Sequence, residues 1–113
     1  MVKRYSSLDS ELDLIFGALS DSTRRDILKR NAKKEMSVTD IAKPYDLSLP
    51  AVSKHLKVLE NAKLIQKHRD GKMYLVTLSP NALMEASDYL RSYEALWNDR
   101  LDRLEQYLHS LPQ

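Results

Sequence analysis

The sequence predicts one mainly α-helical domain that carries a small β-hairpin. At 113 residues with 42% hydrophobic content, the chain can fill one core but not comfortably two. Its 30% charged residues and only two glycines are typical of a helix-rich protein. Asp70-Gly71, between residues 64–69 and 72–78, is a strong hairpin signal, and no proline or glycine follows Pro80 before His109, which favours one long helix.

Two helices are expected in the first third of the chain. Apolar residues at helical spacing predict the first over about residues 9–19. Asp21 is a suitable N-cap for the second, over about residues 22–31. We expect its basic residues Arg24 and Arg25 to be solvated or paired with nearby acids. The polar run 31–35 predicts a loop.

A very short helix and a longer one are expected next. Ser37 and Asp40 resemble a capping box that opens the short helix, and Pro44 disfavours helix beyond Lys43. The longer helix begins about four residues later, at Ser48. This is the spacing of a helix-turn-helix, which we place at residues 37–62. Because the turn contains no glycine, Asp46 is expected to supply its left-handed residue.

The longer helix, residues 48–61, has one apolar side and one small, basic side. Ser48 is a good N-cap, and proline is tolerated in the first turn. The apolar positions recur at helical spacing and should pack inward: Leu49, Val52, Leu56 and Leu59. The other side offers short side chains and positive charge to a polyanion, with His55 at its edge: Pro50, Ser53, Lys54 and Lys57.

The hairpin is expected over residues 64–78. With Asp70-Gly71 as its two-residue loop, Arg69 pairs with Lys72, Lys67 with Tyr74, and Ile65 with Val76. This register places the apolar residues on the core face: Ile65, Val76 and Leu78. It leaves the basic residues near the tip, where they can reach a phosphate: Lys67, Arg69 and Lys72.

The long helix is expected over residues 80–109. Its apolar residues repeat every seven positions or fill the neighbouring positions three or four residues on: Leu83, Ala86, Leu90, Tyr93, Trp97, Leu101, Leu104 and Leu108. Thirty helical residues span about 45 Å. A domain this small cannot bury so long a stripe, so we expect the helix to pair with a second copy of the chain.

Charge and composition narrow the functional classes. Residues 48–78 carry a net charge of +4 and residues 79–113 a net charge of −3, so the middle third is suited to an anionic partner. No apolar run resembles a signal peptide or a membrane span, so we expect a cytoplasmic protein. The chain has no cysteine, no phosphate-binding glycine loop and no catalytic constellation, so we expect neither an enzyme nor a cofactor.

Several motifs together resemble the ArsR family of winged helix-turn-helix regulators. They are Leu19-Ser-Asp-Ser-Thr-Arg-Arg-Asp-Ile-Leu28, Val38-Thr-Asp-Ile-Ala42, Leu47 to Ile65 with its Ser-Lys-His-Leu-Lys-Val-Leu core, and Arg69-Asp-Gly-Lys-Met-Tyr74. The third motif is the most specific. Residues 93–105 resemble the branch of the family without metal sites, and His109 is the only histidine of the last helix, so no metal is expected.

The resemblance implies a single domain, 1–113, that forms a homodimer through its first and last helices. Residues 48–61 would lie in the major groove of double-stranded DNA, with the hairpin as a wing beside the backbone. The expected DNA-binding residues are Ser48, Pro50, Ala51, Ser53, Lys54, His55, Lys57, Arg69 and Lys72. The expected dimer interface consists of Leu12, Ile15, Phe16, Leu83, Leu90, Tyr93, Trp97, Leu101, Leu104 and Leu108.

Each of these assignments has an alternative. The two lysines of residues 48–61 could be a solvated helix face, and His55 could brace its helix against the domain. Tyr89, Tyr93 and Trp97 could line a small-molecule pocket, although a dimer interface is favoured. We expect a repressor that binds an inverted-repeat operator. The alternatives are a winged-helix protein-interaction module and a repressor gated by an organic effector, whose identity the sequence does not indicate.

Overall fold

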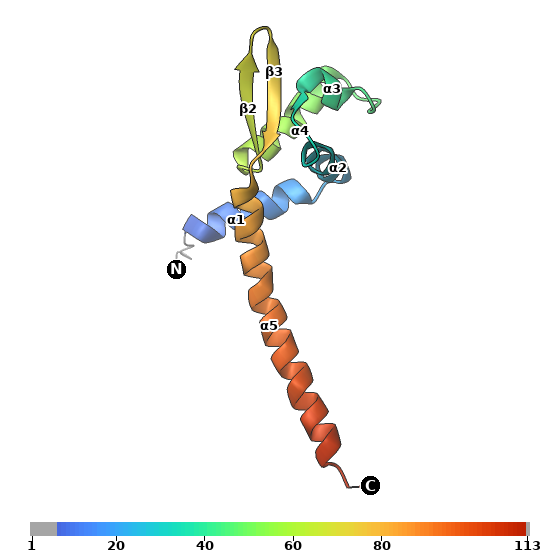
Figure 1. The fold of residues 1–113 in the computed structure, drawn as a ribbon, viewed down its shortest axis with the longest axis vertical. Coiled ribbons are helices and arrows are strands. Elements are labelled where there is room, and N and C mark those ends of the chain that lie inside the picture. Colours follow the sequence, from blue (N-terminus) through green and yellow to red (C-terminus); the bar gives the residue numbers. More distant parts are fainter. Residues whose placement is uncertain (1–6, 113) are drawn as a thin grey trace, which may run out of the picture.

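A computed structural model describes residues 7–112, in which one long helix projects from a body formed by the other elements (Figure 1). The elements are, in order, α1 (Ser7–Leu19), α2 (Ser22–Asn31), β1 (Met36–Ser37), α3 (Val38–Ala42), α4 (Leu49–Asn61), β2 (Ile65–Asp70), β3 (Met73–Leu78) and α5 (Pro80–Ser110). The molecule measures 72 × 41 × 23 Å because α5 extends far beyond the body. This mainly helical fold with a β-hairpin confirms the predicted fold class.

Three helices begin at the cap residues that the sequence predicts. The side chain of Asp21 accepts a hydrogen bond from the backbone N–H of Arg24, which lowers the pKa of this carboxyl. Ser37 caps α3 by accepting from the backbone N–H of Asp40, and Ser48 caps α4 in the same way. Such caps satisfy N–H groups that have no partner inside the helix, which fixes where each helix begins.

The core lies where α1, α2, α3 and α4 meet the sheet and the first turns of α5. Its members include Ile15, Ile27, Ile41, Val52, Leu56, Leu59, Leu64, Ile65, Val76, Ala82 and Ala86. Beyond Ala86, every residue of α5 except the half-buried Ser87 is exposed. The body therefore has a core of its own, whereas most of α5 has none.

The sheet has a third strand that the sequence did not indicate. β1 pairs antiparallel with β3, Met36 opposite Val76 and Ser37 opposite Leu75, so the strand order is β1-β3-β2. The Nδ2 of buried Asn31 donates to the carbonyl of Val76 at 2.8 Å, which attaches the end of α2 to the sheet. A strand of two residues has no periodicity to detect, because its pairing partner lies far along the chain.

The hairpin register differs from the predicted one by two residues. Asp70 pairs with Met73 and closes the hairpin, so the two loop residues are Gly71 and Lys72 rather than Asp70 and Gly71. Gly71 has a φ of 62° and the second loop position does not have a positive φ, as in a type II′ turn. Because the error is two residues, the predicted core face is correct: Ile65 and Val76 are buried and Leu78 is half-buried.

The turn between α3 and α4 does not use a left-handed residue, so the expectation for Asp46 was wrong. Instead, side chains attach the turn to α2. Tyr45 donates a hydrogen bond to the carboxylate of Asp26, and the Arg30 guanidinium lies 5.3 Å from the Tyr45 ring centroid. Arg30 also donates to the carbonyl of Ile41 at 2.8 Å. These contacts hold the turn without a glycine.

The left-handed residue lies at the other end of α4. Between residues 7 and 112, Lys63 is the one non-glycine residue with a positive φ, 60°. Its N–H donates to the carbonyl of Glu60 at 2.9 Å, and the N–H of Leu64 donates to that of Leu59 at 3.0 Å. This is the Schellman motif, and both leucines are fully buried. It ends α4 and directs the chain into β2.

Candidate nucleic-acid interface

The outward side of α4 carries the predicted small and basic residues. Ser48, Pro50, Ser53, Lys54 and Lys57 are exposed, and Ala51 is half-buried. Val52, Leu56 and Leu59 are buried on the opposite side, as expected. Leu49 was expected inside but is 56% exposed, because it is the first residue of the helix and lies beside the exposed turn. The helix thus presents two lysines and short side chains to its surroundings.

The wing adds a second basic surface on the core side of the hairpin. Lys67 and Arg69 share a strand face with buried Ile65, and Tyr74 shares it with buried Val76, because side chains alternate along strands. Near the body this face packs on the core, and its residues towards the tip are exposed. The hairpin itself projects from the body (Figure 1). Lys67, Arg69 and Tyr74 therefore lie on the same side of the hairpin as the core and α4.

Tyr74 organises the two cations of this face. The Lys67 Nζ lies 5.0 Å and the Arg69 Cζ 5.9 Å from the centroid of its ring, within the range of cation–π attraction. The Arg69 Nε also donates to the carbonyl of Gly71 at 3.0 Å, and Lys72 is exposed in the loop. Lys67 was expected near the tip, within reach of a phosphate, but neither it nor Tyr74 was named among the expected DNA-binding residues, although strand alternation places both on the face of Arg69.

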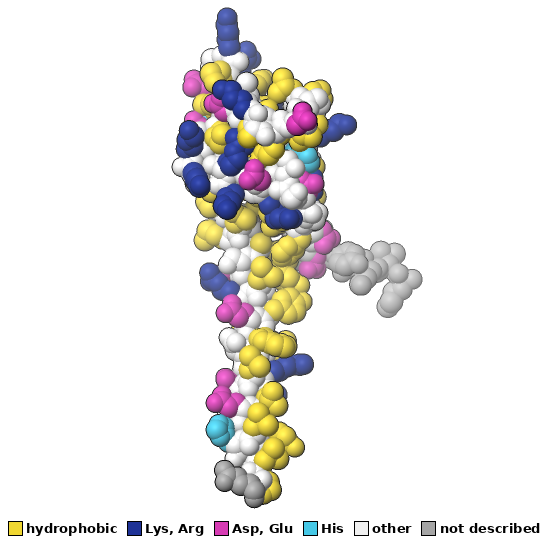
Figure 2. Space-filling model, turned by 90° about the vertical axis from the view of Figure 1, so that its right-hand side faces the viewer, with side chains coloured by type: hydrophobic (Ala, Val, Ile, Leu, Met, Phe, Trp, Pro, Cys, Tyr) yellow, Lys and Arg dark blue, Asp and Glu magenta, His cyan; other side chains and the backbone are white. Residues whose placement is uncertain are grey.

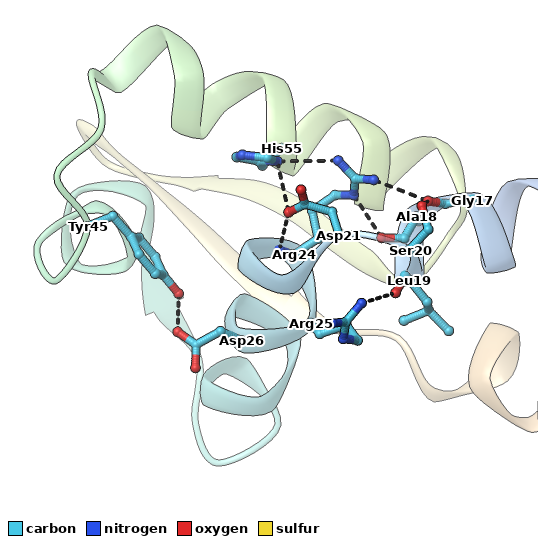
Figure 3. Close-up of polar contacts among 10 residues, drawn as sticks. All are labelled: Gly17, Ala18, Leu19, Ser20, Asp21, Arg24, Arg25, Asp26, Tyr45 and His55. Carbon is cyan, nitrogen blue, oxygen red and sulfur yellow. Dashed lines mark hydrogen bonds and ion pairs between the residues drawn. The ribbon is translucent and has the colours of Figure 1, made fainter.

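His55 lies differently from the other predicted DNA-binding residues. It is half-buried and faces the start of α2, where its Nδ1 lies 3.4 Å from the Arg24 Nη1 and 3.8 Å from the Asp21 carboxylate (Figure 3). This is the bracing arrangement considered above as its alternative.

The two arginines of α2 are not simply solvated. Arg24 donates to the carbonyls of Ala18 at 2.7 Å and Gly17 at 3.1 Å, and Arg25 donates to that of Leu19 at 2.9 Å. Both side chains therefore bind the C-terminal end of α1, whose carbonyls have no partners inside the helix. The expectation that these arginines are solvated or paired with nearby acids was incomplete, since Arg25 is exposed but both side chains also bind backbone carbonyls six or seven residues away.

The predicted dimer-interface residues fall into two groups. Leu12 and Ile15 are buried within the chain's own core, and Phe16 and Leu83 are half-buried. The remaining six are exposed along α5: Leu90, Tyr93, Trp97, Leu101, Leu104 and Leu108. Figure 2 shows a stripe of hydrophobic side chains down one side of this helix, while basic side chains gather over the body. On α1, the exposed large apolar residues are instead Leu8 and Leu14.

The stripe begins in a groove between α1 and α5. The groove has a volume of about 340 Å³, and its apolar lining includes Phe16, Leu19, Leu83, Ala86 and Leu90. The rings of Phe16 and Tyr89 lie 5.9 Å apart and attach α1 to α5 beside it.

Within residues 7–112, no three His, Cys, Asp or Glu side chains lie close enough to hold a metal ion. None of the helices in this part of the chain is both long and apolar enough to cross a membrane.

Comparison with known proteins agrees with this architecture. The sequence pattern of the arsR family of bacterial regulatory proteins matches residues 21–67, from the N-cap of α2 into β2. The transcriptional repressor SdpR of Bacillus subtilis is 33% identical over 79 residues, which cover 70% of this chain and 88% of SdpR. The chain belongs to the arsR family. This ArsR-family protein is a DNA-binding transcriptional regulator.

Solved structures place the whole fold in the same group. An ArsR-like transcriptional regulator from Rhodococcus sp. RHA1 has a TM-score of 0.77 and 27% identity, over 94% of this chain and 100% of that one. The homodimeric winged helix-turn-helix domain of Mb0332 from Mycobacterium bovis has a TM-score of 0.64 and 23% identity, over 85% and 94% of the two chains. The relatives named here are regulators, which agrees with the expectation that this ArsR-family protein is not an enzyme.

Proposed function

We propose that this protein is a homodimeric repressor that binds an inverted-repeat operator in double-stranded DNA. The observation that supports this most directly is the outward side of α4, where Lys54 and Lys57 are exposed next to short side chains at a sharply capped helix start. A major groove admits a helix with such a surface, and lysines pair with the phosphates beside it. SdpR, which aligns with 70% of this chain, is named a transcriptional repressor.

We assign residues 37–62 to the helix-turn-helix, 64–78 to the wing and 80–109 to dimerisation, within one domain, 1–113. In the wing, Arg69 and Lys72 would contact the phosphate backbone, and we add Lys67 and Tyr74 from their place on the same exposed face. On α4, Ser53 and His55 would hydrogen-bond to base edges or phosphates, whereas Pro50 and Ala51 would touch thymine methyl groups.

Self-association is supported by the stripe on α5. Six large apolar side chains that the sequence places at helical spacing are exposed on the single chain, and a second α5 would cover them. The related domain of Mb0332 is described as homodimeric. A two-fold axis through this interface would present two copies of α4 about 34 Å apart, one helical turn of DNA. The interface would then combine the stripe with the half-buried Phe16 and Leu83.

We further propose that the repressor does not respond to metals and works in the cytoplasm, where its DNA lies. The sequence has no cysteine to serve as a thiolate ligand, and its histidines belong to three different elements.

Mobility shifts with random-sequence duplex DNA at increasing salt test the proposal. The wild type should shift the duplex at moderate salt, and log K should fall linearly with log salt. Lys54→Ala and Lys57→Ala should each make that slope less steep by about 0.9, the value of one phosphate contact. Lys29→Ala, which removes an exposed lysine of α2 outside α4 and the wing, is the matched control and should leave the slope unchanged. No shift by the wild type would favour a protein-interaction module instead.

A further inference from the structure

Arg24 is the one side chain in Figure 3 that joins α1, α2 and α4. Its Nε and Nη2 bind the last carbonyls of α1, its backbone N–H caps α2 through Asp21, and its Nη1 contacts His55 in the middle of α4. Two of this side chain's three partners thus belong to α1, the element that leads to the proposed dimer interface. The other contact belongs to the helix proposed to enter the DNA groove.

The contact with Arg24 also selects one tautomer of His55. A guanidinium only donates hydrogen bonds, so a hydrogen bond at this 3.4 Å contact requires that Nδ1 accepts and carries no proton. The Asp21 carboxylate, which could accept a proton from Nδ1, is 3.8 Å away, beyond hydrogen-bond distance. The proton of the neutral ring therefore lies on Nε2. Within residues 7–112, no side chain or carbonyl pairs with this Nε2, and 22% of the His55 side chain is exposed.

We propose that Arg24 is a positioning residue for DNA binding, which holds α4 at a fixed orientation to α1 and directs the Nε2–H of His55 outward as a donor. The inference rests on the proposed function, since the donor is offered to DNA. Arg24 itself does not reach the nucleic acid, because all of its donors named above are engaged inside the protein. Its effect on binding passes through His55.

Arg25 provides a matched control. It also binds the end of α1, through the carbonyl of Leu19, but its side chain does not contact α4 in the described structure. Lysine at either position keeps the positive charge but loses the planar guanidinium group with its several N–H donors. Arg24→Lys and Arg25→Lys therefore both weaken the cap of α1, and they differ in the link to His55.

The first experiment measures duplex affinity and its salt dependence for both variants. Arg24→Lys should lower affinity about tenfold with an unchanged salt slope, while Arg25→Lys should bind like the wild type. His55→Gln should lower affinity as well, and the double variant with Arg24→Lys should lose less than the sum of the two single losses, because one residue acts through the other. A slope less steep by about 0.9 in Arg24→Lys would show a direct phosphate contact and overturn the proposal, as would additive losses.

The second experiment locates the imidazole proton in the free protein by two-bond proton–nitrogen NMR at mildly alkaline pH, with the His55 signals assigned from their loss in His55→Gln. The expected result is a protonated Nε2 and an unprotonated Nδ1. A proton on Nδ1 would overturn the proposal even if Arg24→Lys fails to fold. This NMR measurement needs no DNA, so its result does not depend on whether the proposed function is correct. A wild type that binds no duplex would overturn both the proposed function and the role assigned to Arg24.

Discussion

Replacement of Trp97 by alanine should weaken self-association about a thousandfold. Trp97 is 63% exposed on the single chain, and a tryptophan buries up to about 250 Å², so about 160 Å² is available for a partner to cover. At about 25 cal/mol per Å², covering it contributes about 4 kcal/mol per chain and at most about 8 kcal/mol per symmetric dimer. Half of that upper value corresponds to about a thousandfold change in the dissociation constant.

Analytical ultracentrifugation over a concentration series measures this change. The control is Met84→Ala, since Met84 is 61% exposed on the same helix but lies about 140° around it from Trp97. Met84→Ala should self-associate like the wild type. Equal dissociation constants for the two variants would refute the assignment of the α5 stripe to a dimer interface.

Three further changes test the fold beneath the site. Leu59→Ala should lower the free energy of unfolding by about 2 to 5 kcal/mol, because Leu59 is fully buried. Urea titrations at fixed protein concentration measure this loss. A loss below about 1 kcal/mol, close to what substitutions of surface residues cause, would contradict the burial of Leu59. Lys63→Gly should raise the free energy of unfolding by about 1 kcal/mol, since glycine adopts a positive φ without the steric penalty of a side chain. Thermal unfolding measures this gain. A lower melting temperature would argue against the Schellman motif at the C-terminal end of α4. The backbone N–H of Arg24 lowers the pKa of the Asp21 carboxyl, so the ionised carboxylate stabilises the fold above pH 3.8, its ordinary pKa, and this stabilisation is lost as pH falls through the lowered pKa. Asp21→Asn should therefore make stability fall less steeply with decreasing pH on the acid side of a stability–pH curve. An unaltered acid side would count against the cap.

Local signals in the sequence were sufficient for most of the helical fold. Asp21, Ser37 and Ser48 each cap the helix that the sequence assigns to them, because capping needs only residues three positions apart. Lys54 and Lys57 are exposed as predicted, since helical period alone separates them from buried Leu56.

Features that depend on distant residues were not predictable in the same way. β1 exists because Met36 pairs with Val76, and the hairpin register depends on whether Asp70 pairs with Met73 or enters the loop. The sequence pattern therefore gave no sign of β1 and predicted the wrong hairpin register.

The predicted site was incomplete for a related reason. The contact between Arg24 and His55 joins residues 31 positions apart, and it follows from the packing of α2 against α4 rather than from any periodic pattern. Leu12 and Ile15 have the spacing of interface residues, but the same spacing also suits a core, and the structure places both inside it. Periodicity identifies an apolar side of a helix without showing what covers it.

The mass of the complex with DNA tests the central claim most directly. Duplex fragments that the protein retains from its own genomic DNA can be sequenced and then titrated with protein under light scattering. We predict two chains per duplex and two related half-sites about one helical turn apart. A complex of one chain per duplex at full affinity would contradict the proposal that α5 joins two copies of α4 on one operator.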